Sequence, residues 1–549
     1  MPGTFPMNRR LVAAVGMLVG TLVWRLLTFT GFTNDHYAHL ALAQQMLLGD
    51  RPIRDFTDPG WPLTYMISAA AWRLAGSAMW VEWTITAGAF ACAAAFTVAA
   101  AQRLSGSVAI AVLVTAIQVL ISPRTYAYPK LLPYAAFACL IVQSGALSRR
   151  RLALLGLLIG AAFLLRHDHG LWIGLATLAY LALSTPSLRD RALATRISIV
   201  AATTALLLLP WLLFVAANGG LVSYFATAIE YARAEANFSM LRSLPWFRMP
   251  SDDSAIAALV SGPNADAWLF WLFWALPVAG AAIVARRWRR RAERWPGELA
   301  AVGALCVLAA TVNAGFLRDI LRTRFGDATA PAALLGAWLL GVAWTGPWRL
   351  RAAQRIVQLT AALGIVVSFI AVGHVADLGD RFERTNIGAG PTGVAERFLQ
   401  HVRLLQLPHR QELMPPSRTS AVLMPFFAYL DRCTIATDRL IVTGEFPDVV
   451  VLSGRGFASD GVVFGAWYSS TANQPRTLER LRGHPALFVV AADDPARFHR
   501  WFPLVARFVD EEYAPFAALG GEGVHVPVLV DRRRRPARVD AETGWPCYR

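Results

Sequence analysis

The strongest constraint on this chain is a series of apolar runs that are long enough, or nearly so, to cross a bilayer. The hydrocarbon core is about 30 Å thick, which about 20 helical residues span. Of the 549 residues, 56% are hydrophobic and 16% are charged, whereas soluble domains are about 25% charged. The sequence therefore predicts a mainly α, polytopic membrane helix bundle and excludes a soluble enzyme, a disordered scaffold and a fibrous repeat. The eleven runs are 11–31, 79–101, 105–121, 131–147, 152–165, 170–184, 197–217, 267–285, 299–317, 328–346 and 356–374.

Basic clusters between these runs predict the orientation, because cytoplasmic loops collect Lys and Arg. All the clusters fall on one side only if 152–184 forms two helices and the apolar stretch 62–75 does not cross. We therefore expect 62–75 to be an interfacial or re-entrant helix, and 1–31 to contain an uncleaved first helix. The N-terminus is predicted inside and everything after residue 374 outside. The clusters are 9–10, 149–151, 189–196, 286–294 and 349–355.

The net charge of +16 could indicate a nucleic-acid partner. However, the arginines lie in short clusters between apolar runs and no nucleic-acid-binding motif is present, so we expect none. Among the basic residues the only lysine is Lys130. It either acts as a compact point charge, which Arg cannot replace, or has survived by chance, and both readings stay open.

The sequence changes character after residue 374, where charge rises and short apolar runs alternate with helical patterns. We predict two domains: a transmembrane domain, 1–374, with a first outer loop at 32–78, and an extracytoplasmic α/β domain, 375–549. Cys433 and Cys547 are the only cysteines of the second domain. An oxidising compartment favours a disulfide between them over two free thiols. Strands are expected at 439–443, 449–452, 486–491 and 524–530, and helices at 394–405 and 495–509.

The predicted outer loops carry polar residues that topology does not require. Asp35 follows the first apolar run and precedes a helical pattern, so it is expected near a helix N-terminus with His39 on the same face. This acid is either a functional carboxylate or an N-cap.

Two further outer turns are basic, against the positive-inside bias. Arg124 and Lys130 lie in one, and Arg322 and Arg324 in the other. Guanidinium and ammonium groups bind phosphate oxygens, so these residues are candidates for a phosphorylated lipid. The alternatives are pairing with Asp319 or Asp327, or contact with lipid headgroups.

The turn 166–170 contains Arg166, His167, Asp168 and His169. Imidazole and carboxylate are metal ligands, but adjacent helical residues point in different directions. An Arg166–Asp168 pair that orders the turn is therefore favoured over a metal site. The sequence has no CxxC, P-loop or GxSxG motif, and no GxGxxG after a strand.

The stretch Asp35–Pro62 resembles the GT-C glycosyltransferases. The similarity lies in an acid directly after the first span, then Ala43, Met46-Leu47, Gly49, Pro52, Arg54-Asp55-Phe56 and Pro62. The most similar branch contains the dolichyl-phosphate-mannose protein mannosyltransferases and the lipid A aminoarabinose transferases. The many-span body and the outer C-terminal domain also fit this branch.

The resemblance implies transfer of a sugar from a polyprenyl-phosphate donor to an envelope acceptor (glycan, lipid or protein), usually with inversion. Asp35 would be the catalytic base, and Arg124, Lys130, Arg322 and Arg324 would bind the donor phosphate. The chain departs from many relatives in carrying Asp35-His36 instead of Asp-Glu, which leaves open whether a divalent cation takes part. Asp35 with His36 and His39 are the first candidate ligands. Further residues expected to shape the loop or bind the acceptor are Asp55, Asp58, His39, Arg166 and Asp168.

Two other classes of function stay open. A lipid-linked sugar flippase is disfavoured because the halves of the chain show no internal repeat and ionisable residues lie at helix ends. A non-catalytic membrane sensor would use the α/β domain to bind a ligand. The expected location in every case is a bacterial-type inner membrane.

Overall fold

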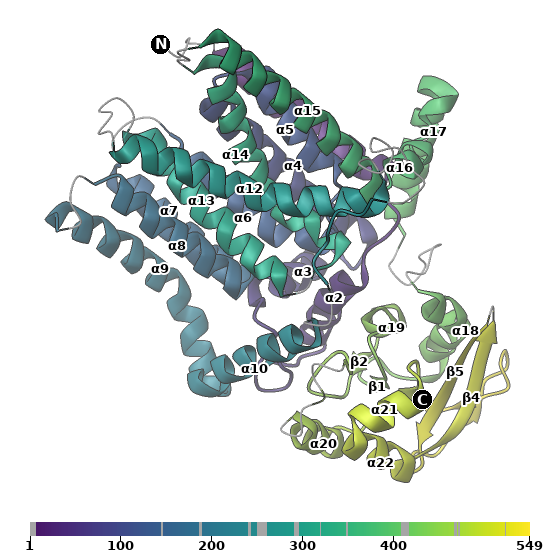
Figure 1. Cartoon of the computed structure of the whole chain (residues 1–549). Coiled ribbons are helices and arrows are strands. Elements are labelled where there is room, and N and C mark those ends of the chain that lie inside the picture. Colours follow the sequence, from purple (N-terminus) through teal and green to yellow (C-terminus); the bar gives the residue numbers. More distant parts are fainter. Residues whose placement is uncertain are drawn as a thin grey trace. The chain divides into compact units, whose positions relative to one another are not determined.

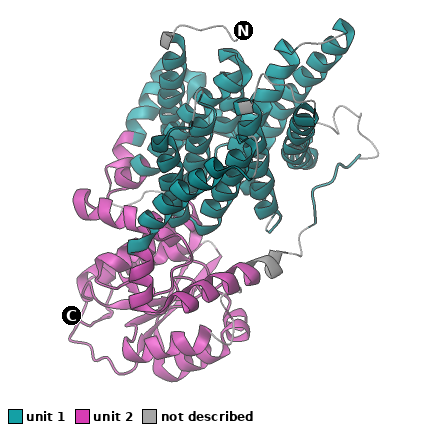
Figure 2. Cartoon of the chain, turned by 90° about the vertical axis from the view of Figure 1, so that its left-hand side faces the viewer, with its two compact units in different colours: residues 1–29, 84–210, 239–401 teal, residues 30–83, 211–238, 402–549 magenta. Residues whose placement is uncertain are grey.

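The computed structural model divides into two compact units (Figure 2), which are described separately. Unit 1 comprises residues 1–29, 84–210 and 239–401, and unit 2 comprises 30–83, 211–238 and 402–549. Asp319, Arg349 and residues 290–294 of the 286–294 basic cluster lie outside the described residues. The structure describes residues 7–143, 147–185, 189–239, 243–249, 261–289, 296–318, 320–346, 350–407, 417–465, 469, 473–521 and 523–549.

Each of the eleven apolar runs forms a helix (Figure 1). Seven of the described helices are long and apolar enough to cross a membrane, whereas α5 to α8 have 13 to 17 residues each. The chain is an integral membrane protein, and the predicted helix bundle is confirmed. The helices are α1 (Met7–Leu27), α4 (Met79–Ser105), α5 (Val108–Leu120), α6 (Tyr128–Ile141), α7 (Arg149–Leu165), α8 (His167–Leu183), α9 (Arg191–Asn218), α12 (Gly262–Arg289), α13 (Pro296–Leu317), α14 (Phe325–Thr345) and α15 (Arg351–Val375).

The run 152–184 is two helices, as the charge pattern predicts. The break is at Arg166, whose extended backbone (φ −168°, ψ 119°) ends α7 and caps α8. The two helices pack against each other, and Gly170 allows this because a Cβ there would lie 2.4 Å from the Cα of Phe163. The turn is therefore a tight hairpin.

The predicted outer turns of unit 1 meet at one end of the bundle. Arg25, near the end of α1, donates to the carbonyl of Pro123 at 2.8 Å, and Arg318, after α13, lies 3.9 Å from Asp168 in the α7–α8 turn. At the opposite helix ends, Arg151 donates to the carbonyl of Gln143 at 2.8 Å. The turns therefore lie at two opposite ends of the bundle, as expected if an even number of helices separates the basic clusters. The side of the membrane on which each end lies stays a prediction.

The first outer loop belongs to unit 2. It forms α2 (Asn34–Leu47) and α3 (Pro62–Ala75), which pack against each other, and unit 2 also contains most of α10 (Leu221–Ser239). The stretch 62–75 is thus a separate helix of 14 residues. After α15 the chain forms α16 (Leu378–Arg384), η3 (Ile387–Ala389) and α17 (Gly390–Leu405).

The segment 417–549 is here called the C-terminal part. A five-stranded mixed sheet forms its core, in the order β2-β1-β3-β5-β4. Strands β2, β1 and β3 are parallel, and β5 pairs antiparallel with both β3 and β4. The long β4–β5 hairpin closes one edge (Figure 1). The strands are β1 (Arg439–Val442), β2 (Gly456–Phe457), β3 (Phe488–Val490), β4 (Tyr513–Gly521) and β5 (Val524–Asp531), with a small β6 (Arg538–Val539) and β7 (Pro546–Cys547) pair. The helices are α18 (Arg418–Cys433), α19 (Pro447–Ser453), α20 (Asn473–Gly483), α21 (Pro495–Trp501) and α22 (Pro503–Glu512).

Most elements expected in this part are confirmed, but one is wrong. Strands form at β1, β3 and β5, and 394–405 lies in α17. The expected strand 449–452 is instead the buried helix α19, which has Pro447 in its first turn and ends at Gly454 with φ +63°. The expected helix 495–509 is interrupted at Phe502, because Pro503 starts a second helix.

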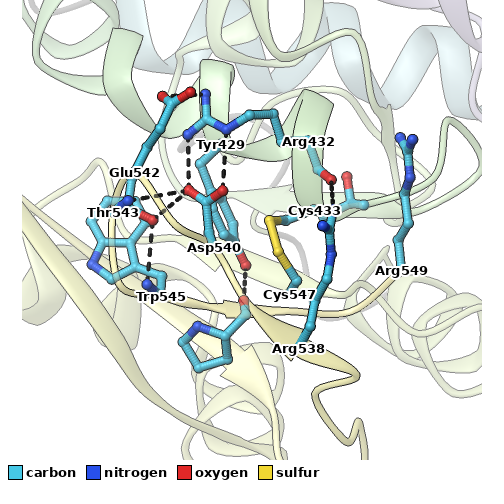
Figure 3. Close-up of a disulfide and its surroundings, with 12 residues drawn as sticks. Tyr429, Arg432, Cys433, Arg538, Asp540, Glu542, Thr543, Trp545, Cys547 and Arg549 are labelled. Carbon is cyan, nitrogen blue, oxygen red and sulfur yellow. Dashed lines mark hydrogen bonds and ion pairs between the residues drawn. A yellow bond between two sulfur atoms is a disulfide. The ribbon is translucent and has the colours of Figure 1, made fainter.

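A disulfide joins Cys433, at the end of α18, to Cys547, with a Cα–Cα distance of 4.5 Å (Figure 3). Its surroundings also hold the C-terminal segment in place, because Arg432 donates to Asp540 at 2.9 Å and Tyr429 donates to the carbonyl of Pro546. The two cysteines are 114 residues apart in sequence, and closing a loop of this size typically stabilises a domain by about 2–4 kcal/mol.

Unit 2 fastens the first outer loop to the C-terminal sheet through Gln45 and Asp50. The side-chain amide of Gln45 donates to the carbonyl of Phe457 and accepts from its N–H, both at 3.0 Å, so it continues the edge of β2. Asp50 accepts two bonds from Arg439, both at 2.6 Å, and one from Arg480 at 2.5 Å. The C-terminal sheet therefore holds the loop that begins with Asp35.

We expect Asp50→Asn to destabilise this attachment by about 3 kcal/mol, because two poorly exposed guanidinium groups lose their carboxylate. Burial alone would raise the pKa of Asp50, but bonds from Arg439, Gln45 and Arg480 outweigh it and lower the pKa to about 2. The carboxylate is charged above the unfolded pKa of about 4, so its stabilisation is lost as pH falls from about 4 to 2.

Hydrogen exchange in α2 and β1 of the full chain measures this effect. Faster exchange in Asp50→Asn at pH 7 is expected, with Asp510→Asn on exposed α22 as the matched control. Equal protection in the two variants would contradict the proposed attachment.

Candidate active site

Asp35 lies in the first turn of α2, not at its N-cap. The N-cap is Thr33, whose backbone is extended (φ −81°, ψ 160°). The Asp35 side chain is exposed, and a carboxylate in the first turn of a helix is favoured by the helix dipole. The alternative prediction, that Asp35 is the N-cap of this helix, is therefore wrong.

Asp35 lines a pocket of about 120 Å³ that lies wholly within unit 2. Its walls come from three segments far apart in sequence: the first outer loop, α10 and the C-terminal part. This pocket is smaller than the roughly 300–1,000 Å³ typical of drug-sized ligands, so it has room for a small group such as a single ring. The lining residues that carry the argument below are Asn34, Asp35, Trp61, Tyr231 and Glu445.

Glu445 is a second acid of this pocket, and the sequence analysis missed it. It follows β1, at the carboxyl end of a parallel strand, where open α/β sheets commonly bind ligands. Its backbone carbonyl accepts a bond of 2.9 Å from the amide of Asn34. The side chain is exposed overall, yet desolvation by neighbouring atoms, with the negative charges of Asp35 and Asp493, raises the pKa of Glu445 to about 7. The predicted strand 439–443 could have led to this residue.

His36 and His39 are buried, whereas Asp35 is exposed. His36 stacks on Phe32 and lies 3.3 Å from the carboxylate of Glu82, a second residue that the sequence analysis missed. His39 packs edge-on against Trp61, with ring centroids 4.3 Å apart. Asp35, His36 and His39 do not form a cluster that could hold one ion. Among the described residues only Cys433, Asp540 and Cys547 are close enough together, and there the two sulfurs are joined in the disulfide.

Asp58 and Asp55 hold the shape of the loop between α2 and α3. One oxygen of Asp58 accepts from the N–H groups of Gly60 and Trp61 at 3.0 and 3.2 Å, and the other accepts from the Tyr224 hydroxyl at 2.6 Å. Asp55 accepts from the backbone N–H of Arg51 at 2.8 Å. Their contacts thus place Trp61 in the wall of the pocket.

Unit 1 contains a second group of charged residues, centred on Lys130. This lysine is buried, and its Nζ lies 2.5 Å from the carboxylate of Asp327 and 4.5 Å from the Tyr126 ring centroid. Arg124 covers the same ring at 4.4 Å and bonds to its hydroxyl. Arg324 interacts electrostatically with Lys130 and Asp327. Lys130, Arg124 and Arg324 are here called the cation cluster, in which Lys130 pairs directly with Asp327.

Arg322 and the α7–α8 turn have different partners. Arg322 lies 3.1 Å from Asp266 and donates to the carbonyl of His374, and its role in binding the donor phosphate stays a prediction. Arg166 pairs with Asp168 at 3.0 Å, as the favoured alternative predicts, and His169 bonds to the hydroxyl of Tyr134. Asp35 belongs to unit 2 and Lys130 to unit 1, so their implied roles in one reaction stay a prediction.

No family model and no curated protein matches the chain. Among solved structures, the chain is similar to the crystal structure of ArnT from Cupriavidus metallidurans bound to undecaprenyl phosphate. The two are 15% identical with a TM-score of 0.48, and the match covers 95% of this chain and 98% of that one. At this identity and TM-score the similarity assigns neither a substrate nor an acceptor to this chain.

Proposed function

We propose that this chain is a glycosyltransferase that moves a sugar from a polyprenyl-phosphate donor to an envelope acceptor. The reaction takes place at the outer face of a bacterial-type inner membrane, where the C-terminal part also lies. One observation supports it: an exposed carboxylate lies in a small pocket, in a chain that also has a cation cluster around the buried Lys130 at one end of its helix bundle.

In the proposed step, an acceptor hydroxyl attacks the anomeric carbon of the donor while the Asp35 carboxylate takes its proton. The new carbon–oxygen bond forms as the bond between the anomeric carbon and the phosphate oxygen breaks, and that electron pair leaves with the lipid phosphate. A single displacement of this kind inverts the anomeric configuration.

The leaving phosphate needs positive charge more than it needs a proton. Lys130, Arg124 and Arg324 place three basic side chains at this end of unit 1, and Asp327 lies in direct contact with Lys130. Preorganised cations of this kind stabilise charge that develops in the transition state.

The glycan and glycolipid profile of a deletion strain tests this proposal. We expect one sugar to be missing, and to return with the wild-type gene but not with Asp35→Asn. An unchanged profile would contradict the proposal. Movement of a lipid-linked sugar without any acceptor would instead identify a flippase.

A further inference from the structure

The Asp35 pocket is negatively charged. It contains two carboxylates, Asp35 and Glu445, and none of the described residues that line it is basic. A third acid, Asp493, interacts electrostatically with Glu445 from the loop after β3. Arg497 of α21 lies 3.3 Å from Asp493 and also interacts electrostatically with Glu445.

The position of Glu445 is fixed by backbone contacts. Gly444 has φ +81°, and a Cβ there would lie 2.9 Å from the Cβ of Asp493, so only glycine lets the two loops approach this closely. The N–H of Asp493 also donates to the hydroxyl of Thr443 at 3.0 Å. On the other side, the amide of Asn34 holds the carbonyl of Glu445 at 2.9 Å. The acid is therefore a built part of the pocket.

The remaining walls suit a sugar ring. Trp61 and Tyr231 supply aromatic surface, and Asn34, Asp35 and Glu445 supply hydrogen-bonding groups. Pockets that orient a ligand combine apolar and aromatic walls with a few placed polar groups. A carboxylate accepts hydrogen bonds from hydroxyls, but it repels a phosphate or a second carboxylate.

We propose that this pocket takes a neutral, hydroxyl-bearing acceptor, a single sugar ring, and rejects an acceptor that carries an anionic group at the reacting end. The proposal rests on the proposed function and adds the acceptor class. Glu445 is its specificity-determining residue, because it places a second carboxyl group beside Asp35.

The rejection of anions should depend on pH. Glu445 has a pKa of about 7, so it is largely protonated at pH 6 and largely charged at pH 8. The charged and titratable groups around it are Asp35 on α2, Asp493 after β3, Arg497 on α21 and Tyr231 on α10. Repulsion of an anionic ligand should therefore grow as pH rises from 6 to 8.

Binding of soluble sugars to the purified full chain in detergent tests the proposal without requiring transfer. The probes are the methyl glycosides of glucose, galactose, mannose and N-acetylglucosamine, and the 6-sulfate of each, measured by saturation-transfer NMR. A sulfate ester keeps its charge between pH 6 and 8, whereas a phosphate titrates near pH 6.

We expect at least one neutral glycoside to bind about tenfold more tightly than its sulfate at pH 8, a preference that corresponds to about 1.4 kcal/mol. Glu445→Gln should reduce this preference to about threefold and remove its pH dependence, whereas Glu511→Gln on exposed α22 should change neither. Equal or tighter binding of the sulfate, no binding of any glycoside, or an unchanged pH dependence in Glu445→Gln would overturn the proposal. Retained transfer in Asp35→Asn would instead refute the proposed function, and the binding result would still stand.

Discussion

Asp35→Asn should lower sugar transfer by about 10²–10⁴-fold, the usual contribution of a positioned general base. The amide has nearly the same shape but cannot take a proton from the acceptor hydroxyl. Because the Asp35 side chain is exposed in the first turn of α2, the fold should change little. Transfer by reconstituted protein, together with its thermal unfolding midpoint, measures both effects.

Asp510→Asn is the matched control. Asp510 is exposed on α22 and lies 3.6 Å from His499, far along the chain from the proposed chemistry. It should retain full activity. An Asp35→Asn enzyme with activity within threefold of the wild type would remove Asp35 from the reaction, whatever its stability.

Lys130→Met should be damaging in two ways. It removes the direct partner of the buried Asp327 carboxylate, and breaking a buried ion pair in this way typically costs about 3–5 kcal/mol of folding free energy. It also removes one of the three positive charges of the cation cluster, so donor phosphate should bind more weakly. Loss of transfer alone would not distinguish these effects.

The double variant Lys130→Met with Asp327→Leu separates them. Replacing both members of a buried ion pair by apolar residues is often neutral or stabilising, so this variant should recover thermal stability. It should nevertheless remain inactive and bind polyprenyl phosphate poorly. Full activity in the double variant would show that Lys130 is only the structural partner of Asp327.

The helix bundle could be predicted from the sequence because each apolar run is judged separately. Its length shows whether it can cross the hydrocarbon, and the basic residues beside it indicate its orientation. The break at Arg166 followed from keeping the basic clusters on one face, and the structure has its helix end there. The strand predicted at 449–452 failed because a short apolar run does not distinguish a buried strand from a buried helix. Pro447 and Gly454 were the local signals for the helix.

The site was less predictable because its residues meet across long sequence distances. Lys130 and Asp327 are 197 residues apart, and Asn34 and Glu445 are 411 apart. Asp35 was suggested by its place after the first span, whereas nothing near Glu445 in the sequence indicates Asn34 as its neighbour. Local pattern can identify a strand end, but the partner that faces it depends on tertiary packing.

The central claim is that Asp35 and Lys130 act on one sugar phosphate, and cysteine cross-linking tests it most directly. Cys92, Cys139 and Cys306, the free cysteines, are first replaced by Ala, and Asp35→Cys with Lys130→Cys is treated with a short bifunctional thiol reagent. We predict a cross-link that polyprenyl phosphate blocks, and none between Asp35→Cys and Arg287→Cys. Failure of the first pair to cross-link, in protein whose two new thiols both react with a monofunctional reagent, would contradict this claim.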